Sequence, residues 1–311
     1  MFLGWQYSCN ILTKLNQKLS EHFDNDDLTI AVAGSFGRFD AGEPSDLDFY
    51  VVSDNVHTNQ QIHETVTKFA KELKLKLPNT EGTFSKVLEL PQIIKKMGGN
   101  HETPDELAQR LLLLLETQPI YNVEFYEKAV NGILDKYFDL HKKHPYKEAV
   151  ILLNDLIKYF RYICMNYQFN FWGNNEKWVI RNIKLRHSRV IMYAGLLFVL
   201  LNASKHGVEK TEYIKNMVNL TPVERINAVL TENDVDPSPL FECYDKYLCS
   251  INNVAVRESF NACPLEYTDR YANPVFKELK ANSDCLQTFL TNSVLDMRGK
   301  WSPKAFEYLI F

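Results

Sequence analysis

Two aspartates separated by one residue are the side chains best suited to chemistry in this sequence. They lie in Ser45-Asp46-Leu47-Asp48-Phe49, at the start of an apolar run. In an extended strand the side chains at positions i and i+2 point to the same face, so we expect Asp46 and Asp48 side by side, with Leu47 and Phe49 in the core. Adjacent carboxylates repel unless a cation joins them, and a hard divalent ion such as Mg²⁺ binds oxygen ligands and completes its shell with phosphates. The pair therefore predicts a phosphate-handling metal site.

A glycine-containing turn precedes the aspartate pair. The apolar run Leu28–Ala33 predicts a buried strand, and it leads directly into Gly34 and Ser35. Because Gly34 has no Cβ, backbone N–H groups and the Ser35 hydroxyl can approach a triphosphate closely. A helix that begins at this turn adds the positive end of its dipole. The turn supplies the phosphate-binding donors that the carboxylates lack.

The order of these residues resembles the signature of the nucleotidyltransferase superfamily, whose members share a DNA polymerase β-like fold. The two motifs that carry the resemblance are Gly34-Ser35-x-x-Arg38 and Pro44-Ser45-Asp46-Leu47-Asp48. With Gly37 before the arginine, this form is most similar to bacterial nitrogen-sensing uridylyltransferases and the nucleotidyltransferases grouped with them. In the family the arginine fixes the turn, so we give Arg38 no chemical role.

The resemblance implies a fold and an activity for this part of the chain. It implies a small mixed sheet flanked by helices, and transfer of a nucleoside monophosphate from an NTP, with ATP and UTP as the leading substrates. A hydroxyl on an unknown protein or small molecule accepts the nucleotidyl group, and pyrophosphate is released. By the same resemblance, Asp46 and Asp48 hold Mg²⁺ or Mn²⁺, and Gly34, Ser35 and Ser45 contact the nucleotide.

Two-metal phosphoryl transfer usually requires a third carboxylate, for which the sequence offers two candidates. Glu89 lies in the run Thr83–Leu90, whose alternation predicts a strand beside that of Asp48, with Glu89 on the same sheet face. Glu102 is the alternative, but the following Thr103–Glu106 predicts the N-terminal cap of a helix. We assign Glu89 as the third catalytic residue and metal ligand. A chain without a working third acid would instead be a catalytically silent nucleotide-binding regulatory protein.

Basic residues in the second half of the chain are candidates for further phosphate contacts. Lys158 and Arg161 fall on one face of an expected helix, Ala149–Tyr167, and Arg181 and Lys184 belong to a basic run that follows. Solvated helix faces would explain the same residues without any ligand. The interpretation we adopt is that these four cations bind the triphosphate or an acidic acceptor.

Composition limits the classes of protein to be considered. The 311 residues include 35 Lys and Arg against 39 Asp and Glu, a formal net charge of −4. This balance excludes a generally basic nucleic-acid coat protein and disfavours an enzyme that extends RNA ends, so nucleic acid is not an expected partner. The six cysteines are scattered without a C-x-x-C pair, which predicts reduced thiols and a cytoplasmic protein rather than a zinc ribbon or a disulfide-stapled fold.

The pattern of apolar residues changes near Pro119–Val130. Before this point strand-like and helical runs alternate, and after it the spacing is helical almost throughout. We therefore expect an α+β protein: a polymerase β-like nucleotidyltransferase domain over residues 1–120, and an all-helical domain over 121–311 that supplies acceptor contacts. The most apolar run, Val190–Ala203, is too short to span a bilayer, so we expect a buried helix and no membrane partner.

Overall fold

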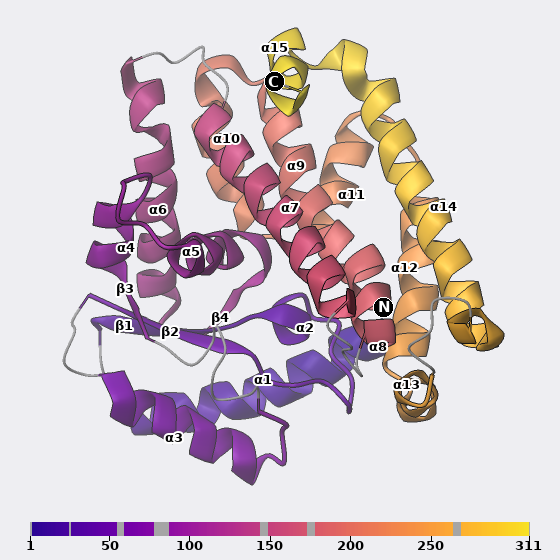
Figure 1. The fold of residues 1–311 in the computed structure, drawn as a ribbon. Coiled ribbons are helices and arrows are strands. Elements are labelled where there is room, and N and C mark those ends of the chain that lie inside the picture. Colours follow the sequence, from indigo (N-terminus) through magenta and orange to yellow (C-terminus); the bar gives the residue numbers. More distant parts are fainter. Residues whose placement is uncertain are drawn as a thin grey trace. The chain divides into compact units, whose positions relative to one another are not determined.

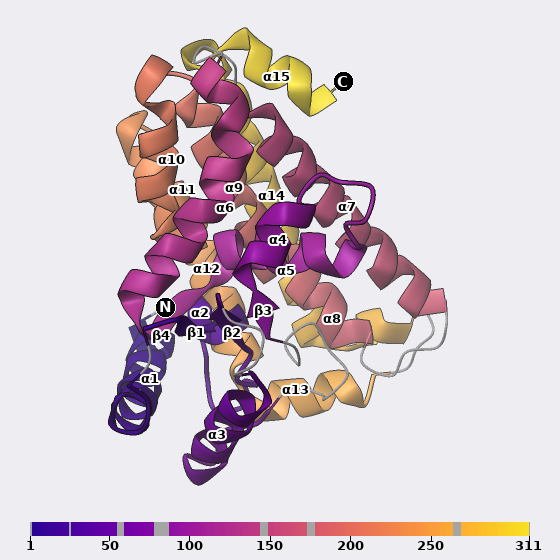
Figure 2. The ribbon, with the colours of Figure 1, turned by 90° about the vertical axis from the view of Figure 1, so that its left-hand side faces the viewer.

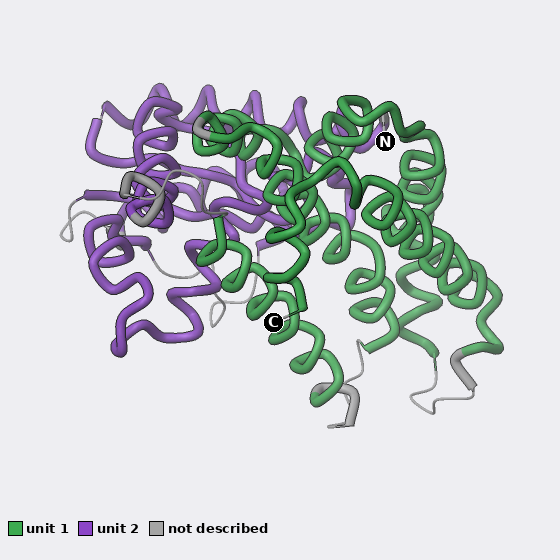
Figure 3. Tube along the Cα trace, turned by 90° about the horizontal axis from the view of Figure 1, so that it is seen from above, with its two compact units in different colours: residues 1, 146–311 green, residues 2–145 purple. Residues whose placement is uncertain are grey.

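The computed structural model describes residues 2–24, 26–54, 59–77, 87–143, 149–172, 178–263 and 269–310. They form two compact units (Figure 3), residues 2–145, here called the sheet unit, and residues 146–311, here called the helical unit. The division into domains 1–120 and 121–311 concerns function and stays a prediction.

The sheet unit contains a mixed sheet with helices on both of its faces (Figure 1). Among the described residues the sheet has four strands in the order β3-β2-β1-β4, and only β2 and β3 are parallel. This confirms the predicted α+β class. The elements in chain order are α1 (Phe2–His22), β1 (Leu28–Val32), α2 (Gly34–Gly37), β2 (Phe49–Ser53), α3 (Asn59–Glu72), β3 (Leu88–Glu89), α4 (Leu90–Lys96), α5 (Pro104–Glu116), β4 (Gln118–Tyr121) and α6 (Val123–Lys143).

The two central strands are continuous apolar runs because both of their faces are covered. Every residue of β1 and β2 is buried. Ile30 pairs with Val51, and on this face they belong to one core with Leu15 of α1 and Val66 of α3. Helices α4, α5 and α6 lie over the opposite face (Figure 1), where α6 contacts β1. A strand buried on both faces lacks the polar alternation of a surface strand.

The two edge strands differ from what the sequence suggests. The expected third strand, residues 83–90, lies partly outside the described residues, and within them β3 is only Leu88–Glu89. Helix α4 then begins at Leu90, with a proline in its first turn, where proline is well tolerated. The other edge strand, β4, was not predicted. It pairs antiparallel with β1, and Ile30 lies opposite Tyr121.

The helical unit is built around the apolar helix α9 (Val190–Ala203), which confirms the predicted buried helix. A Cβ on Gly195 would lie only 2.8 Å from Cα of Pro222, so glycine permits the close approach of α9 and α11. The other elements are α7 (Val150–Trp172), α8 (Trp178–Lys184), a π-helix (Leu185–Arg189), α10 (Lys210–Val218), α11 (Pro222–Glu232), α12 (Ser238–Ile251), α13 (Val254–Asn261), α14 (Pro274–Met297), α15 (Pro303–Ile310) and 3₁₀ turns at Gly207–Glu209, Asp269–Ala272 and Arg298–Lys300. Figure 2 gives a second view of these helices.

Within the described ranges, none of the helices combines the length and the hydropathy that a membrane span requires.

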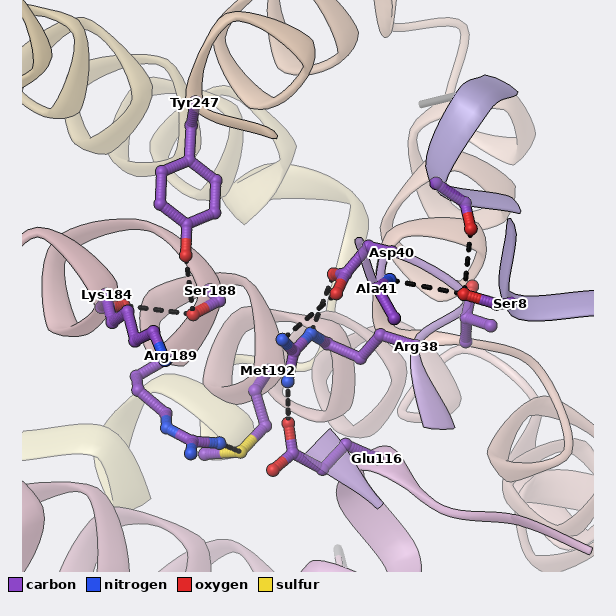
Figure 4. Close-up of polar contacts among 12 residues, drawn as sticks. Ser8, Arg38, Asp40, Ala41, Glu116, Lys184, Ser188, Arg189, Met192 and Tyr247 are labelled. Atoms are coloured by element: carbon purple, nitrogen blue, oxygen red, sulfur yellow. Dashed lines mark hydrogen bonds and ion pairs between the residues drawn. The ribbon is translucent and has the colours of Figure 1, made fainter. Parts of the chain in front are cut away.

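The π-helix between α8 and α9 is stabilised by its own side chains. Backbone hydrogen bonds in a π-helix reach five residues back rather than four. The Ser188 hydroxyl donates to the carbonyl of Lys184, 3.1 Å away and four residues earlier, and itself accepts from the Tyr247 hydroxyl at 3.2 Å (Figure 4). His187 bonds the carbonyl of Ile183 in the same way, at 2.9 Å. Side chains thus bond the carbonyls that backbone N–H groups would reach in an α-helix.

His187 is fully buried and held as the neutral imidazole. A carbonyl only accepts, so Nδ1 carries the proton, and Nε2 accepts from the Asn282 amide at 3.2 Å. The ring stacks on Tyr247 with centroids 4.5 Å apart. Burial is the main cause that lowers the pKa of His187 to about 4; nearby Arg186 acts in the same direction, while the bond to Ile183 and nearby Asp284 oppose the shift.

The first prediction concerns stability in acid. An unfolded histidine binds a proton below about pH 6.5, and His187 in the folded protein does so only below about pH 4. The free energy of unfolding should therefore fall by about 3 kcal/mol from this group alone as the pH drops from about 6.5 to about 4. Denaturant unfolding of the parent and of His187→Gln at pH 7, 5.5 and 4 measures this loss. The variant should lose less on acidification, and equal losses in both proteins would contradict the burial of a neutral histidine.

Candidate active site

The turn after β1 is the first part of the site. Ala33 is extended, and Gly34 then adopts φ of +60°, from which α2 begins. Residues that carry a side chain rarely adopt this backbone conformation. Glycine therefore lets the chain change from a strand to a helix within one residue. A Cβ on Gly34 would lie 2.9 Å from Oδ2 of Asp48. The missing side chain therefore also makes room for the Asp48 carboxylate against the turn.

The aspartate pair lies just before β2. Leu47 and Phe49 are 0% and 1% exposed, whereas Asp46 is exposed and Asp48 half-buried, which confirms the predicted alternation. The backbone on both sides is fixed. The N–H of Ala33 donates to the carbonyl of Asp48 at 2.8 Å, and Asp46 forms a parallel bridge with the segment at residue 76. The two carboxylates thus point away from the core, and the backbone that carries them is held by hydrogen bonds just before β2 begins.

The two serines of the motifs have different environments. Ser45 is buried, its N–H donates to the carbonyl of Gly42 at 2.9 Å, and its hydroxyl accepts from the N–H of Gly42 at 3.0 Å. This hydroxyl closes the turn that leads into Asp46. The half-buried Ser35 makes no side-chain hydrogen bond with the described residues, and its carbonyl accepts from the N–H of Asp40 at 2.9 Å. Ser35 is the serine whose hydroxyl can serve a ligand.

Arg38 holds the turn in place through two carboxylates (Figure 4). Its Nε donates to Asp40 at 2.8 Å and a terminal nitrogen donates to the other Asp40 oxygen at 3.2 Å, while Nη1 pairs with Glu116. The Glu116 side chain is fully buried and that of Asp40 nearly so. An ionic cluster so deep is costly to break, because removal of one member leaves a buried charge without its partner. The structural role expected for Arg38 is confirmed.

Close backbone packing and a second hydrogen-bond chain support the same turn. A Cβ on Gly37 would lie 2.1 Å from the carbonyl oxygen of Glu116, so α2 packs directly on the backbone at the end of α5. On α1, the Ser8 hydroxyl accepts from the N–H of Ala41 at 3.2 Å and donates to the carbonyl of Gly4 at 2.8 Å (Figure 4). Most of these supports join residues far apart in the chain, such as Arg38 with Glu116 and Ser8 with Ala41, so sequence reasoning missed them.

The structure does not bring Glu89 to the aspartate pair. Glu89 pairs with Ser53 in the parallel register, at the far end of β2 from Asp48. Ser53 lies five residues after Asp48 along the extended chain, a distance of roughly 16 Å. Alternation along β2 also places Asp48 and Ser53 on opposite faces. The expectation that Glu89 shares a sheet face and a metal ion with Asp48 is therefore corrected.

The alternative acid, Glu102, has structural partners. Its carboxylate pairs with the fully buried guanidinium of Arg110 and accepts from the N–H of Gly98 at 3.1 Å. Arg110 Nε also donates to the hydroxyl of Tyr137 at 2.8 Å. The next residue, Thr103, caps α5 together with Glu106 in a capping box, as predicted. These bonds hold Glu102 to the α4–α5 connection.

The four candidate phosphate-binding cations all belong to the helical unit. Lys158 and Arg161 are exposed on α7, and Arg181 and Lys184 are half-buried in the last turn of α8. The basic run continues in the π-helix, where Arg189 contacts the sulfur of Met192 at 3.8 Å (Figure 4). Their role in nucleotide binding stays a prediction.

The donor set at the aspartate pair suits a hard divalent cation with few protein ligands. Mg²⁺ is commonly bound through one or two carboxylates plus substrate phosphates. Asp46 and Asp48 supply two carboxylates, and the absence of a side chain at Gly34 lets Oδ2 of Asp48 lie close to the turn. No cluster of three or more His, Cys, Asp or Glu side chains suited to a metal ion occurs within the described residues. The pair fits the ion only in partnership with a phosphate ligand.

The comparison with protein families agrees with this geometry. Residues 12–96 match the sequence model of the family described as the nucleotidyltransferase domain. The match begins within α1, ends with α4, and includes Gly34, Asp46 and Asp48. It supports the nucleotidyltransferase superfamily for this part of the chain and transfer of a nucleoside monophosphate in general. A search of the curated proteins finds no match to the chain. The closer likeness to uridylyltransferases stays a prediction.

The second prediction tests the contact between Gly34 and Asp48. Gly34→Ala adds both backbone strain and a clash with the carboxylate. Gly98→Ala is the matched control, because Gly98 has φ of +72° and nothing within 4 Å of an added Cβ. Gly34→Ala should lower the free energy of unfolding, measured with denaturant, by about 1–3 kcal/mol more than the control does. It should also weaken the binding of metal and nucleotide. Equal costs with unchanged nucleotide binding would show that the close approach is unimportant.

Proposed function

We propose that this protein transfers a nucleoside monophosphate from an NTP, ATP or UTP, to a hydroxyl of a protein or small-molecule acceptor and releases pyrophosphate. The observation that carries the proposal is the Asp48 carboxylate held against Gly34, next to Asp46, in a segment matched by the nucleotidyltransferase family model. The cytoplasm is the proposed setting, since reduced thiols persist there and all six cysteines are free.

Asp46 and Asp48 are the proposed ligands of Mg²⁺ or Mn²⁺. When bound, the ion supplies positive charge that neutralises the triphosphate and the charge that develops during transfer. The side chain of Asp46 is exposed and that of Asp48 is half-buried, so Asp48 has less conformational freedom. Asp48 therefore fixes the position of the ion, and Asp46 supplies the second carboxylate ligand.

The turn at α2 is proposed to bind the phosphates. Ser35 donates its hydroxyl, and the first N–H groups of α2 have no partner four residues earlier in the helix. Ser45 acts indirectly, because its hydroxyl bonds Gly42 and thereby fixes the residue before Asp46. Arg38 makes the turn rigid, because its buried ion pairs with Asp40 and Glu116 hold α2 in place. A rigid turn binds phosphate without the cost of ordering it first.

A second candidate function is a catalytically silent nucleotide-binding regulator. The position of Glu89, at the opposite end of β2, favours it, because the expected third acid does not meet the aspartate pair. The two functions differ in one readout. A transferase releases pyrophosphate and labels an acceptor, whereas a silent regulator binds nucleotide without turnover.

The third prediction tests the function directly. Incubation with each radiolabelled NTP, Mg²⁺ or Mn²⁺ and a cell extract should label one protein or small molecule. Asp46→Asn and Asp48→Asn should abolish the label, because each removes a ligand charge at constant volume. Thermal stability should hold or rise slightly, since two adjacent carboxylates repel each other without a cation.

Asp296→Asn on α14 is the matched control, since this aspartate is exposed and lies in the helical unit. It should leave labelling unchanged. Full activity in both site variants would refute the metal site. Binding without any label in the parent would favour the silent regulator, and a label on RNA would identify a different acceptor class.

The fourth prediction concerns the cations proposed to bind the triphosphate or an acidic acceptor: Lys158, Arg161, Arg181 and Lys184. A charge-assisted contact is worth about 1.5–3 kcal/mol, so alanine at a contacting residue should weaken NTP binding by about tenfold or more. Arg298→Ala and Lys277→Ala, at exposed sites on or next to α14, are the controls and should bind like the parent. Calorimetry with a non-hydrolysable NTP measures the affinities. If all four variants also bind like the parent, the residues are solvated surface charges.

A further inference from the structure

A cavity of about 480 Å³ lies between β3, α4 and the start of α5 in the sheet unit. Figure 2 shows β3 leading into α4, with α5 beside it. Its lining includes Leu88, Glu89, Ile93, Asp105, Glu106 and Gln109, with Lys96 beside Glu106. The cavity is not part of the proposed transfer site, because Glu89 lies opposite the far end of β2 from Asp48.

One of the acidic residues of the cavity is already neutralised. Glu106 accepts from Lys96 Nζ at 2.6 Å, and its other oxygen accepts from the N–H and the hydroxyl of Thr103 at 2.8 and 3.0 Å. The bond to Lys96, followed by those to Thr103, lowers the pKa of Glu106 below its usual value. Glu106 and Lys96 therefore satisfy each other and leave little charge for a ligand.

Two further carboxylates at the cavity have no such partner among the residues that the structure describes. Glu89 is half-buried and Asp105 is exposed, and neither forms an ion pair with the described residues. With Glu106 paired to Lys96, the cavity keeps an excess of negative charge. An anionic ligand would be repelled, whereas a cationic ligand would gain two charge-assisted hydrogen bonds.

The most informative residue is Gln109. It is 7% exposed, lines the cavity, and makes no side-chain hydrogen bond within the described part of the chain. Its amide atoms are not sealed from solvent, so the amide faces the open space of the cavity, where a ligand can replace water. Gln109 lies four residues after Asp105 on α5, so both belong to one helix face. The amide oxygen is an acceptor that a ligand N–H group would satisfy.

We propose that this cavity binds an aliphatic ammonium compound. The ammonium group lies between the carboxylates of Glu89 and Asp105 and donates to the amide oxygen of Gln109. The hydrocarbon part packs on the apolar wall formed by Leu88 and Ile93, both nearly fully buried. An ammonium has three donors and no acceptor, which matches three acceptor groups. A metal ion fits less well, because no cluster of three acidic, His or Cys side chains is present in the described residues.

The test is calorimetric titration of the full chain with pentylamine, and with 1-pentanol and pentanoate as the uncharged and anionic probes. Only the amine should show saturable binding, and its affinity should fall with added NaCl. Glu89→Gln and Asp105→Asn should each weaken it by about tenfold to a hundredfold. Glu127→Gln, an exposed carboxylate on α6 outside the cavity, is the matched control and should bind like the parent.

Gln109→Leu separates binding from folding. The substitution removes an amide that makes no hydrogen bond with the described residues, so thermal stability should hold or rise, while pentylamine affinity should fall. No saturable binding in the parent would overturn the proposal. Equal affinity in the parent and in the Glu89, Asp105 and Gln109 variants would overturn it as well. Because the readout is binding of pentylamine, the result does not depend on nucleotidyl transfer.

Discussion

The sheet unit depends on a single close approach between the backbone of Gly34 and the carboxylate of Asp48. The chain leaves β1 and must enter α2 within one residue, which requires positive φ. At that same residue the antiparallel partner strand brings in Asp48, whose Oδ2 lies 2.9 Å from where a Cβ would be, too close for any side chain at this position. Gly34 thus both adopts the positive φ that the turn needs and leaves room for the carboxylate of Asp48. The metal ligands and the phosphate-binding turn are neighbours for this reason.

A rigid support surrounds this contact. The guanidinium of Arg38 joins the turn to Asp40 and to Glu116 at the end of α5, and Gly37 lets the α2 backbone touch the backbone of Glu116. These contacts bury charge, which is tolerated only because each charge is paired. Their contribution to function is positional. They keep the strand, the turn and the aspartates in register before any ligand arrives.

The sequence predicted those parts of the fold that depend on interactions between residues close together in the chain. The strand at residues 28–33, the strand that begins at the aspartate pair, the apolar helix 190–203 and the cap at Thr103 each depend on neighbouring residues, and each was predicted. The edge strand β4 was missed because it is short, contains Pro119, and forms only by pairing with β1. Glu89 was misplaced because alternation within one segment does not give the register against its neighbour.

The central claim is that Asp46 and Asp48 hold a divalent ion together with a nucleotide. Electron paramagnetic resonance of Mn²⁺, titrated into the parent protein and the Asp48→Asn variant with non-hydrolysable ATP and UTP analogues, tests it most directly. The account predicts a bound Mn²⁺ signal in the parent that requires one of the nucleotides and that is lost in the variant. A nucleotide-dependent Mn²⁺ signal of the same strength in Asp48→Asn would contradict it.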